Sequence, residues 1–88
     1  MVTYTVELSN RAKRDLAALS AEVQTRIVKA LRKLEANPRP SGIEKLKGEV
    51  NGYRLRVGDY RILYEVHDKV LLALVVKIGH RREIYRKR

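Results

Sequence analysis

The chain has 88 residues, which is enough for one domain with a single hydrophobic core and too few for two. It contains no cysteine, and this excludes disulfide bonds, thiolate catalysis and cysteine-ligated zinc. A balance of 20 basic against 10 acidic residues gives a net charge of +10, which favours nucleic acid, ribosomal or acidic protein partners over a merely solvated basic surface.

The amino terminus has no basic segment followed by an apolar one, so it does not resemble a secretory leader. The longest apolar run, residues 70–76, is far shorter than the roughly 20 residues of a membrane helix. We therefore expect a soluble, intracellular protein of the cytoplasm. Apolar and polar residues alternate from Val2 to Glu7 and predict a first strand of about six residues.

Two helices are predicted next. Ser9 or Asn10 is suited to cap the first helix, and Ser20 separates it from the second and caps that one. The second helix ends at Asn37-Pro38, because a residue before proline is driven out of the helical region. The apolar positions at helical spacing are Ala12, Leu16 and Leu19 in the first helix and Val23, Ile27, Ala30, Leu31 and Leu34 in the second.

Residues 39–52 read as a connector, with Pro40 near its start and glycines along it, in which Ile43 and Leu46 are candidates to anchor the loop. Two alternating runs then meet at Gly58-Asp59 and predict a β-hairpin with a two-residue turn. In that register Val57 pairs with Tyr60, Arg56 with Arg61, and Leu55 with Ile62. One face then carries Tyr53, Leu55, Val57, Tyr60, Ile62 and Tyr64, and the other carries Arg54, Arg56 and Arg61.

A turn near residues 67–69 leads into the apolar run 70–78, which is typical of a covered central strand. A basic segment follows Gly79, as a short tail or a final helix. The predicted order is β-α-α-β-β-β in a single domain, residues 1–88. We expect an α+β fold in which a two-helix hairpin packs on one face of a small, mostly antiparallel sheet.

The candidate chemistry lies on the arginine face. Arg56 opposite Arg61 is an unfavourable like-charge pair, and a fold that keeps it is expected to hold an anion there. Arginine suits phosphate, because its planar fork donates paired hydrogen bonds and stays charged. His67 and His80 lie at separate turns without a carboxylate cluster, so we expect no metal site. The candidate residues are Arg54, Arg56, Arg61, His80, Arg81 and Tyr85.

Alternatives remain for several of these side chains. If a bond is cleaved, the proton has to move through His80, Tyr85, Glu65, a rarely deprotonated arginine or the substrate. Tyr85 is also suited to stack on a nucleobase. Glu65 is equally suited to neutralise a neighbouring arginine, and residues 86–88 to supply general electrostatic attraction. The tyrosines on the apolar hairpin face, Tyr53, Tyr60 and Tyr64, are expected to belong to the core.

The sequence resembles the RelE/ParE superfamily of toxins from type II toxin–antitoxin systems. The resemblance spans nearly the whole chain, and its most specific parts are a central block and a closing block. The matching stretches are the opening strand, residues 12–16 (AKRDL) with Leu19, Asn37-Pro38, residues 46–48 (LKG), residues 53–65 (YRLRVGDYRILYE) and residues 79–86 (GHRREIYR).

The resemblance to the RelE branch implies a metal-independent mRNA endonuclease without a cofactor, acting in the ribosomal A site. The 2′-hydroxyl of a ribose attacks the adjacent phosphate and leaves a cyclic phosphate and a 5′-hydroxyl. Arg61 and Arg81 correspond to arginines that contact the phosphate and stabilise charge, and Tyr85 to a tyrosine that orients the substrate. Arg54 and Arg56 replace lysines, which leaves the general base unidentified. We expect catalytic roles for Arg56, Arg61, Arg81 and Tyr85, and RNA contacts from Arg54, His80, Arg82 and Arg86.

The resemblance also implies a cognate antitoxin that covers or displaces the basic site. Three functions stay open at this point: a ribosome-dependent mRNA endonuclease, a ParE-like inhibitor of DNA gyrase without nuclease activity, and a catalytically inactive module that binds nucleic acid or antitoxin. The arginine face and the terminal tyrosine favour the first.

Overall fold

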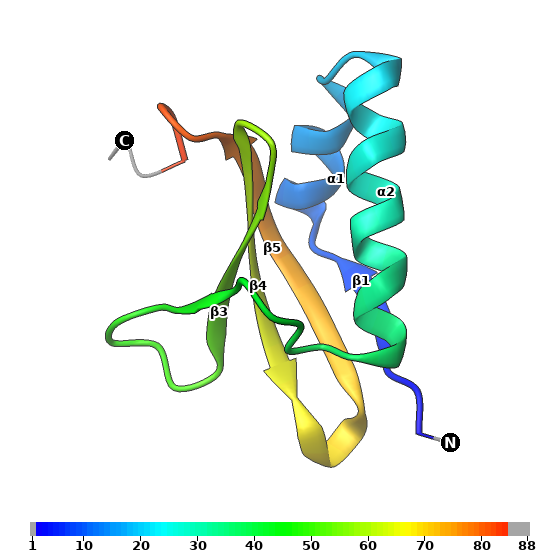
Figure 1. The fold of residues 1–88 in the computed structure, drawn as a ribbon, viewed down its shortest axis with the longest axis vertical. Coiled ribbons are helices and arrows are strands. Elements are labelled where there is room, and N and C mark those ends of the chain that lie inside the picture. The colour runs from blue at the N-terminus through cyan, green and yellow to red at the C-terminus, as the bar shows by residue number, and fades with distance from the viewer. Residues whose placement is uncertain (1, 85–88) are drawn as a thin grey trace.

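The computed structural model describes residues 2–84, which form two helices and a five-stranded sheet. The strands lie in the order β1-β5-β4-β3-β2, with β1 parallel to β5 and all other neighbours antiparallel. Both helices cover one face of the sheet (Figure 1). The predicted α+β class and the helix hairpin on one sheet face are confirmed. The elements are β1 (Thr5–Leu8), α1 (Asn10–Ala17), α2 (Ala21–Ala36), β2 (Glu44–Lys45), β3 (Gly52–Val57), β4 (Tyr60–His67), a 3₁₀ turn η1 (Asp68–Val70) and β5 (Leu72–His80).

Two strands differ from the prediction. β1 begins at Thr5 rather than Val2, because the amide of Tyr4 donates to the carbonyl of Glu35 at the end of α2 instead of to the sheet. The predicted connector contains an additional short strand, β2, in which Glu44 pairs with Arg54 and Lys45 with Tyr53. A two-residue strand is too short to produce an alternating pattern, so sequence periodicity does not reveal it.

Serine side chains begin both helices, as predicted. The Ser9 hydroxyl accepts a hydrogen bond from the Ala12 amide at 3.0 Å, and the Ser20 hydroxyl accepts one from the Val23 amide at 3.3 Å. Each bond satisfies one of the amides that a helix leaves unpaired in its first turn. α2 ends at Ala36, and Asn37 caps it. Within residues 2–84, no helix is both long and apolar enough to cross a membrane.

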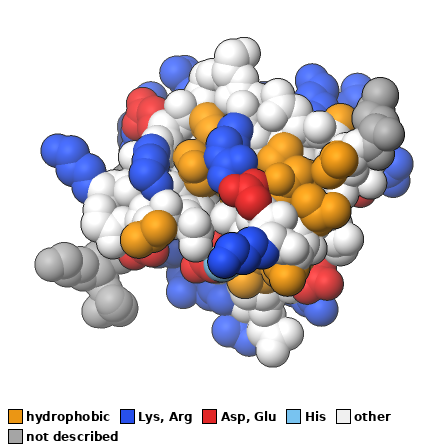
Figure 2. Space-filling view, turned by 90° about the horizontal axis from the view of Figure 1, so that it is seen from below, with side chains coloured by type: hydrophobic (Ala, Val, Ile, Leu, Met, Phe, Trp, Pro, Cys, Tyr) orange, Lys and Arg blue, Asp and Glu red, His pale blue; other side chains and the backbone are white. Residues whose placement is uncertain are grey.

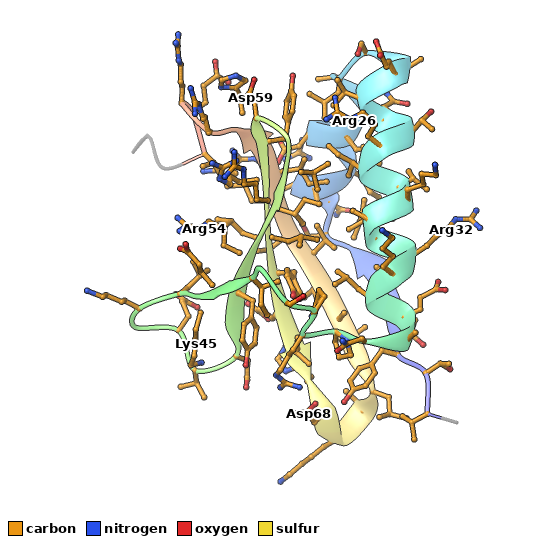
Figure 3. The ribbon with its side chains drawn as sticks, in the orientation of Figure 1. Arg26, Arg32, Lys45, Arg54, Asp59 and Asp68 are labelled. Carbon is orange, nitrogen blue, oxygen red and sulfur yellow. The ribbon has the colours of Figure 1, made fainter. Side chains whose placement is uncertain are left out.

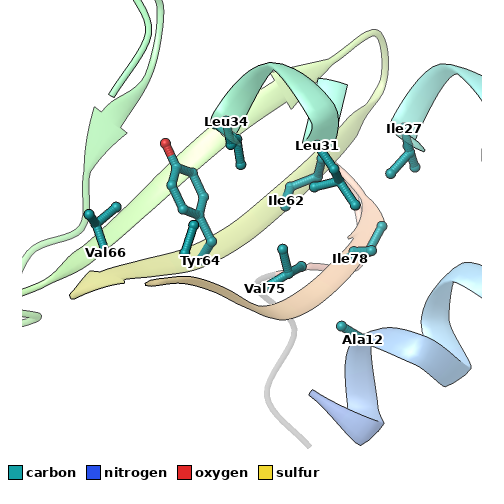
Figure 4. Close-up of a cluster of buried hydrophobic side chains, with 10 residues drawn as sticks. Ala12, Ile27, Leu31, Leu34, Ile62, Tyr64, Val66, Val75 and Ile78 are labelled. Carbon is teal, nitrogen blue, oxygen red and sulfur yellow. The ribbon is translucent and has the colours of Figure 1, made fainter. Parts of the chain in front are cut away.

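The hydrophobic core lies between the helices and the two strands β4 and β5 (Figure 4). Tyr64 is fully buried, and its hydroxyl donates to the Pro38 carbonyl at 2.7 Å. Burial raises the pKa of Tyr64 to about 12. Tyr53 and Tyr60 are half-buried and pack against the same cluster, so the prediction of three core tyrosines is confirmed. The buried members are Ala12, Ile27, Leu31, Leu34, Ile62, Tyr64, Val66, Ala73, Val75 and Ile78.

The expected turn after β4 is present, and Asp68 in it holds several segments together. The guanidinium of Arg39 donates to both oxygens of the Asp68 carboxylate, at 3.1 and 2.8 Å, and the Tyr4 hydroxyl donates to it at 2.6 Å. The hydrogen bonds from Arg39 and then from Tyr4 lower the pKa of Asp68 to about 2. At this end of the molecule, basic, acidic and hydrophobic side chains are interspersed (Figure 2).

This network predicts a pH-dependent contribution to stability. The folded pKa of Asp68 lies below its ordinary value of 3.8, so its contribution is complete above that value and disappears as pH falls towards 2. Asp68→Asn should therefore lower the urea midpoint at neutral pH, and the difference from the wild type should shrink between about pH 4 and pH 2. A midpoint difference that stays constant over this interval would contradict the assignment.

Candidate functional site

The hairpin of β3 and β4 has the predicted register, with Val57 opposite Tyr60, Arg56 opposite Arg61 and Leu55 opposite Ile62. Gly58 has a φ of +59°, whereas Asp59 has no positive φ, which is the pattern of a type II′ turn. A side chain at position 58 would be strained by this φ and would also meet a guanidinium nitrogen of Arg26 at 2.6 Å. Arg26 belongs to α2, and it reaches the hairpin tip beside Asp59 (Figure 3).

The arginines of the hairpin lie on the sheet face that the helices do not cover, as predicted. Arg54 points away from the helices in Figure 3. Together with Arg56 and Arg61 it lines a hollow of about 170 Å³, to which Gly42 and Glu44 also contribute. Three guanidinium groups around one small hollow can surround a phosphate with charged hydrogen-bond donors.

The like-charge pair Arg56–Arg61 is held by the turn itself. Nε of Arg56 donates to the Gly58 carbonyl at 3.4 Å, and Nη1 of Arg61 donates to the same oxygen at 3.2 Å. Nη1 of Arg61 also donates to the Tyr60 carbonyl at 3.1 Å. These carbonyl dipoles orient the two guanidinium groups without neutralising them. Over residues 2–84, neither Arg56 nor Arg61 is ion-paired with a carboxylate, so the hollow keeps an excess of positive charge.

Glu44 is a site residue that sequence reasoning missed. Its carboxylate forms an ion pair with Arg54, which lies directly opposite it on the neighbouring strand. The connector carries two carboxylates, Glu44 and Glu49, among its glycines, and nothing in its sequence indicates that Glu44 pairs with β3. Arg54 is therefore ion-paired with a carboxylate in the candidate site, whereas Arg56 and Arg61 have no ion pair with a carboxylate of residues 2–84.

The segment after β5 returns to the hairpin tip. The amide of Arg81 donates to the Asp59 carbonyl at 2.8 Å, which places the backbone of Arg81 beside the turn that orients Arg56 and Arg61. Arg81 and Arg82 are exposed, and residues 81–84 form a turn anchored by the buried side chain of Ile84. Tyr85 and Arg86, predicted as site residues, lie outside the described residues, as does any final helix beyond residue 84.

The two described candidates for the general base are not at the hollow. His80 packs edge-on against Tyr60, with ring centroids 5.5 Å apart, and its Nδ1 accepts from the Arg82 amide at 3.1 Å. It lines a separate groove between α1 and the end of β5. The carboxylate of Glu65 hydrogen-bonds to Nε2 of His67 at 2.9 Å, and Glu65 does not line the arginine hollow.

Metal binding is not supported by the placement of potential ligands. In the described part of the chain, no three His, Cys, Asp or Glu side chains are grouped to hold a metal ion.

The fold and the hollow together define a small, basic α+β protein with an arginine-lined hollow on an open sheet face. The family described as the ParE toxin of the type II toxin–antitoxin system parDE matches residues 6–85. The chain therefore belongs to this toxin family, within the RelE/ParE superfamily that the sequence resembles.

Individual relatives agree with this membership. Toxin RelG of Mycobacterium tuberculosis is 33% identical over 86 residues, covering 96% of this chain and 98% of the relative. The mRNA interferase toxin RelE of Escherichia coli is 28% identical over 88 residues, covering 96% and 92%. The archaeal RelE–RelB complex from Pyrococcus horikoshii OT3 contains a chain that superposes with a TM-score of 0.82 at 29% identity, covering 93% of this chain and 99% of that one.

Proposed function

We propose that residues 1–88 form one toxin domain that cleaves mRNA in the ribosomal A site and so arrests translation in the cytoplasm. The observation that carries this proposal is the hollow that Arg56 and Arg61 both line, where neither is ion-paired with a carboxylate of residues 2–84. Such paired, fork-shaped donors match the geometry of a phosphate. The Escherichia coli relative named an mRNA interferase supports the same activity.

The proposed reaction is an attack of the ribose 2′-oxygen on the neighbouring phosphorus, with departure of the 5′-oxygen. Arg61 and Arg56 bind the phosphate oxygens, and Arg81 stabilises the charge that develops on them. Tyr85 orients the substrate, while Arg54, His80, Arg82 and Arg86 contact the RNA. No metal or cofactor takes part. The ribosome positions the reacting groups, and positioning alone can lower a barrier by several kcal/mol.

The proposal includes a cognate antitoxin, because the structural neighbours include RelE–RelB complexes. A second surface of this chain suits an acidic segment of such a partner. A groove of about 530 Å³ lies between α2 and β3. The described residues that line it include apolar side chains and no carboxylate, and its basic members are Arg26, Lys29, Lys33 and Arg56. Basic and apolar side chains that line one groove favour a partner peptide that carries acidic and apolar side chains.

The proposal is tested by inducing the protein without its antitoxin and mapping mRNA 5′ ends. New ends should appear inside codons of translated messages, and they should disappear when the same message lacks a start codon. Purified toxin should reproduce the cleavage only when programmed ribosomes are present. Intact messages in arrested cells would overturn the proposal.

A gyrase inhibitor is the second candidate, and the ParE description of the matching family favours it. It predicts inhibition of DNA supercoiling by the purified protein and a DNA-damage response with intact messages. The third candidate, an inactive binding module, predicts that expression without antitoxin is harmless. Message mapping separates the endonuclease from the other two candidates, and growth after induction without antitoxin separates those two from each other.

A further inference from the structure

The general base is the missing part of the proposed reaction. Arginine is a poor proton acceptor at neutral pH, because its guanidinium stays protonated. His80 lines a different groove, and Glu65 is bonded to His67. Among the described residues that line the arginine hollow, Glu44 supplies the single carboxylate.

Glu44 is also placed where a proton acceptor has to be. It extends from β2 and lines the same hollow as Arg56 and Arg61, so its carboxylate lies beside the space assigned to the scissile phosphate. Its side chain is 66% exposed, against 27% for Arg54, so it remains accessible to a substrate hydroxyl while paired. The attacking 2′-oxygen belongs to the ribose on the 5′ side of that phosphate and lies on the carbon next to the one that carries the phosphate through its 3′-oxygen.

A carboxylate next to a phosphate site is electrostatically unfavourable unless a cation accompanies it. Arg54 is that cation, because it is ion-paired with Glu44 across the two strands. The arrangement thus combines a charged acceptor with a net positive hollow.

We infer that Glu44 is the general base of this toxin, an inference that rests on the proposed mRNA cleavage. The carboxylate of Glu44 takes the proton of the ribose 2′-hydroxyl as the 2′-oxygen forms its bond to phosphorus. The bond from phosphorus to the 5′-oxygen breaks, and the leaving oxygen takes a proton from water. The products are a 2′,3′-cyclic phosphate and a 5′-hydroxyl, and Glu44 then releases its proton to solvent.

The test is single-turnover cleavage of a labelled message in programmed ribosomes by the wild type, Glu44→Gln and the matched control Glu49→Gln. Glu49 lies in the β2–β3 loop and does not line the arginine hollow. Glu44→Gln should cleave about 10²–10⁴-fold more slowly, the usual contribution of a general base, and Glu49→Gln should match the wild type. The folding of each variant is checked by its urea midpoint.

The pH dependence separates proton transfer from a merely positioning role. The wild-type rate should be nearly independent of pH around neutrality, because a carboxylate is already ionised there. The Glu44→Gln rate should rise about tenfold per pH unit as hydroxide replaces the lost base. A variant that cleaves at the wild-type rate, or more slowly with the same flat profile, would overturn the inference while leaving the proposed function intact. A wild type that never cleaves would overturn both.

Discussion

Replacing Arg61 with alanine should lower the rate of mRNA cleavage by about 10²–10³-fold and abolish growth arrest, the range measured when a charge-stabilising donor is removed from an active site. Arg61 is half-buried, lines the hollow and is held by hydrogen bonds from its guanidinium to two backbone carbonyls. The measurement is single-turnover cleavage in programmed ribosomes, together with colony formation after induction.

The same substitution at Arg81 should abolish toxicity as well, since its backbone is hydrogen-bonded to the hairpin tip and its side chain is exposed there. Arg32→Ala is the matched control, because Arg32 is an exposed arginine on α2 that points away from the sheet (Figure 3). The Arg32→Ala substitution removes the same charge, and Arg32 does not line the hollow. Wild-type toxicity in Arg81→Ala, or equal losses in Arg32→Ala, would contradict the assignment.

Loss of Arg61 should affect activity without destabilising the fold. One of its hydrogen bonds goes to the carbonyl of Gly58 in the exposed turn and the other to the part-buried carbonyl of Tyr60. Water can replace the donor at the first, and removal of Arg61 relieves the repulsion from Arg56. The urea midpoint of Arg61→Ala should therefore equal or slightly exceed that of the wild type. A hollow that holds unneutralised arginines at some cost in stability is typical of a site maintained for binding.

The register of the β3–β4 hairpin is predicted by the sequence pattern alone. A two-residue turn at Gly58-Asp59 determines the register of both strands, and the period of two then separates apolar from basic side chains. The predicted pairs and the arginine face follow from those two facts alone. β2 was missed for the opposite reason: two residues have no measurable period, and their pairing depends on where the preceding loop lies.

The candidate site was predicted less completely than the fold. Periodicity assigns a residue to a face, but it does not say which loops approach that face, so Glu44 could not be found. It also does not give the direction of a ring at a strand end: His80 is next to Arg81 in sequence, yet it packs against Tyr60 in another groove. The shared hydrogen bonds to the Gly58 carbonyl likewise depend on side-chain torsions that sequence spacing does not determine.

The two faces of β4 carry different kinds of side chain: core residues on one face and an arginine of the candidate site on the other. Arg61 lies on the open face, and Ile62, the next residue, is fully buried beneath α2 with no exposed surface (Figure 4). Substitutions at these neighbouring positions should therefore have separate effects, one on activity and the other on the free energy of unfolding. This separation can be tested directly at Ile62.

Ile62→Ala should lower the free energy of unfolding by about 2–5 kcal/mol, because it removes buried methyl and methylene groups and leaves a cavity in the core. An 88-residue domain has a total stability on the order of 5–10 kcal/mol, so the variant should be partly unfolded on modest heating. Urea denaturation measures the loss. Ile62→Val, which removes one methylene, is the matched control and should cost about 0.5–1.5 kcal/mol.

The folded fraction of Ile62→Ala should retain wild-type cleavage, because the hollow is built by side chains on the opposite face of the sheet. Activity per folded molecule is therefore the decisive quantity, measured at a temperature where the urea curve gives a known folded population. A loss of activity much larger than the loss of folded protein would show that the core beneath β4 also sets the geometry of the arginines. A free energy of unfolding within about 0.5 kcal/mol of the wild type would instead contradict the burial of Ile62.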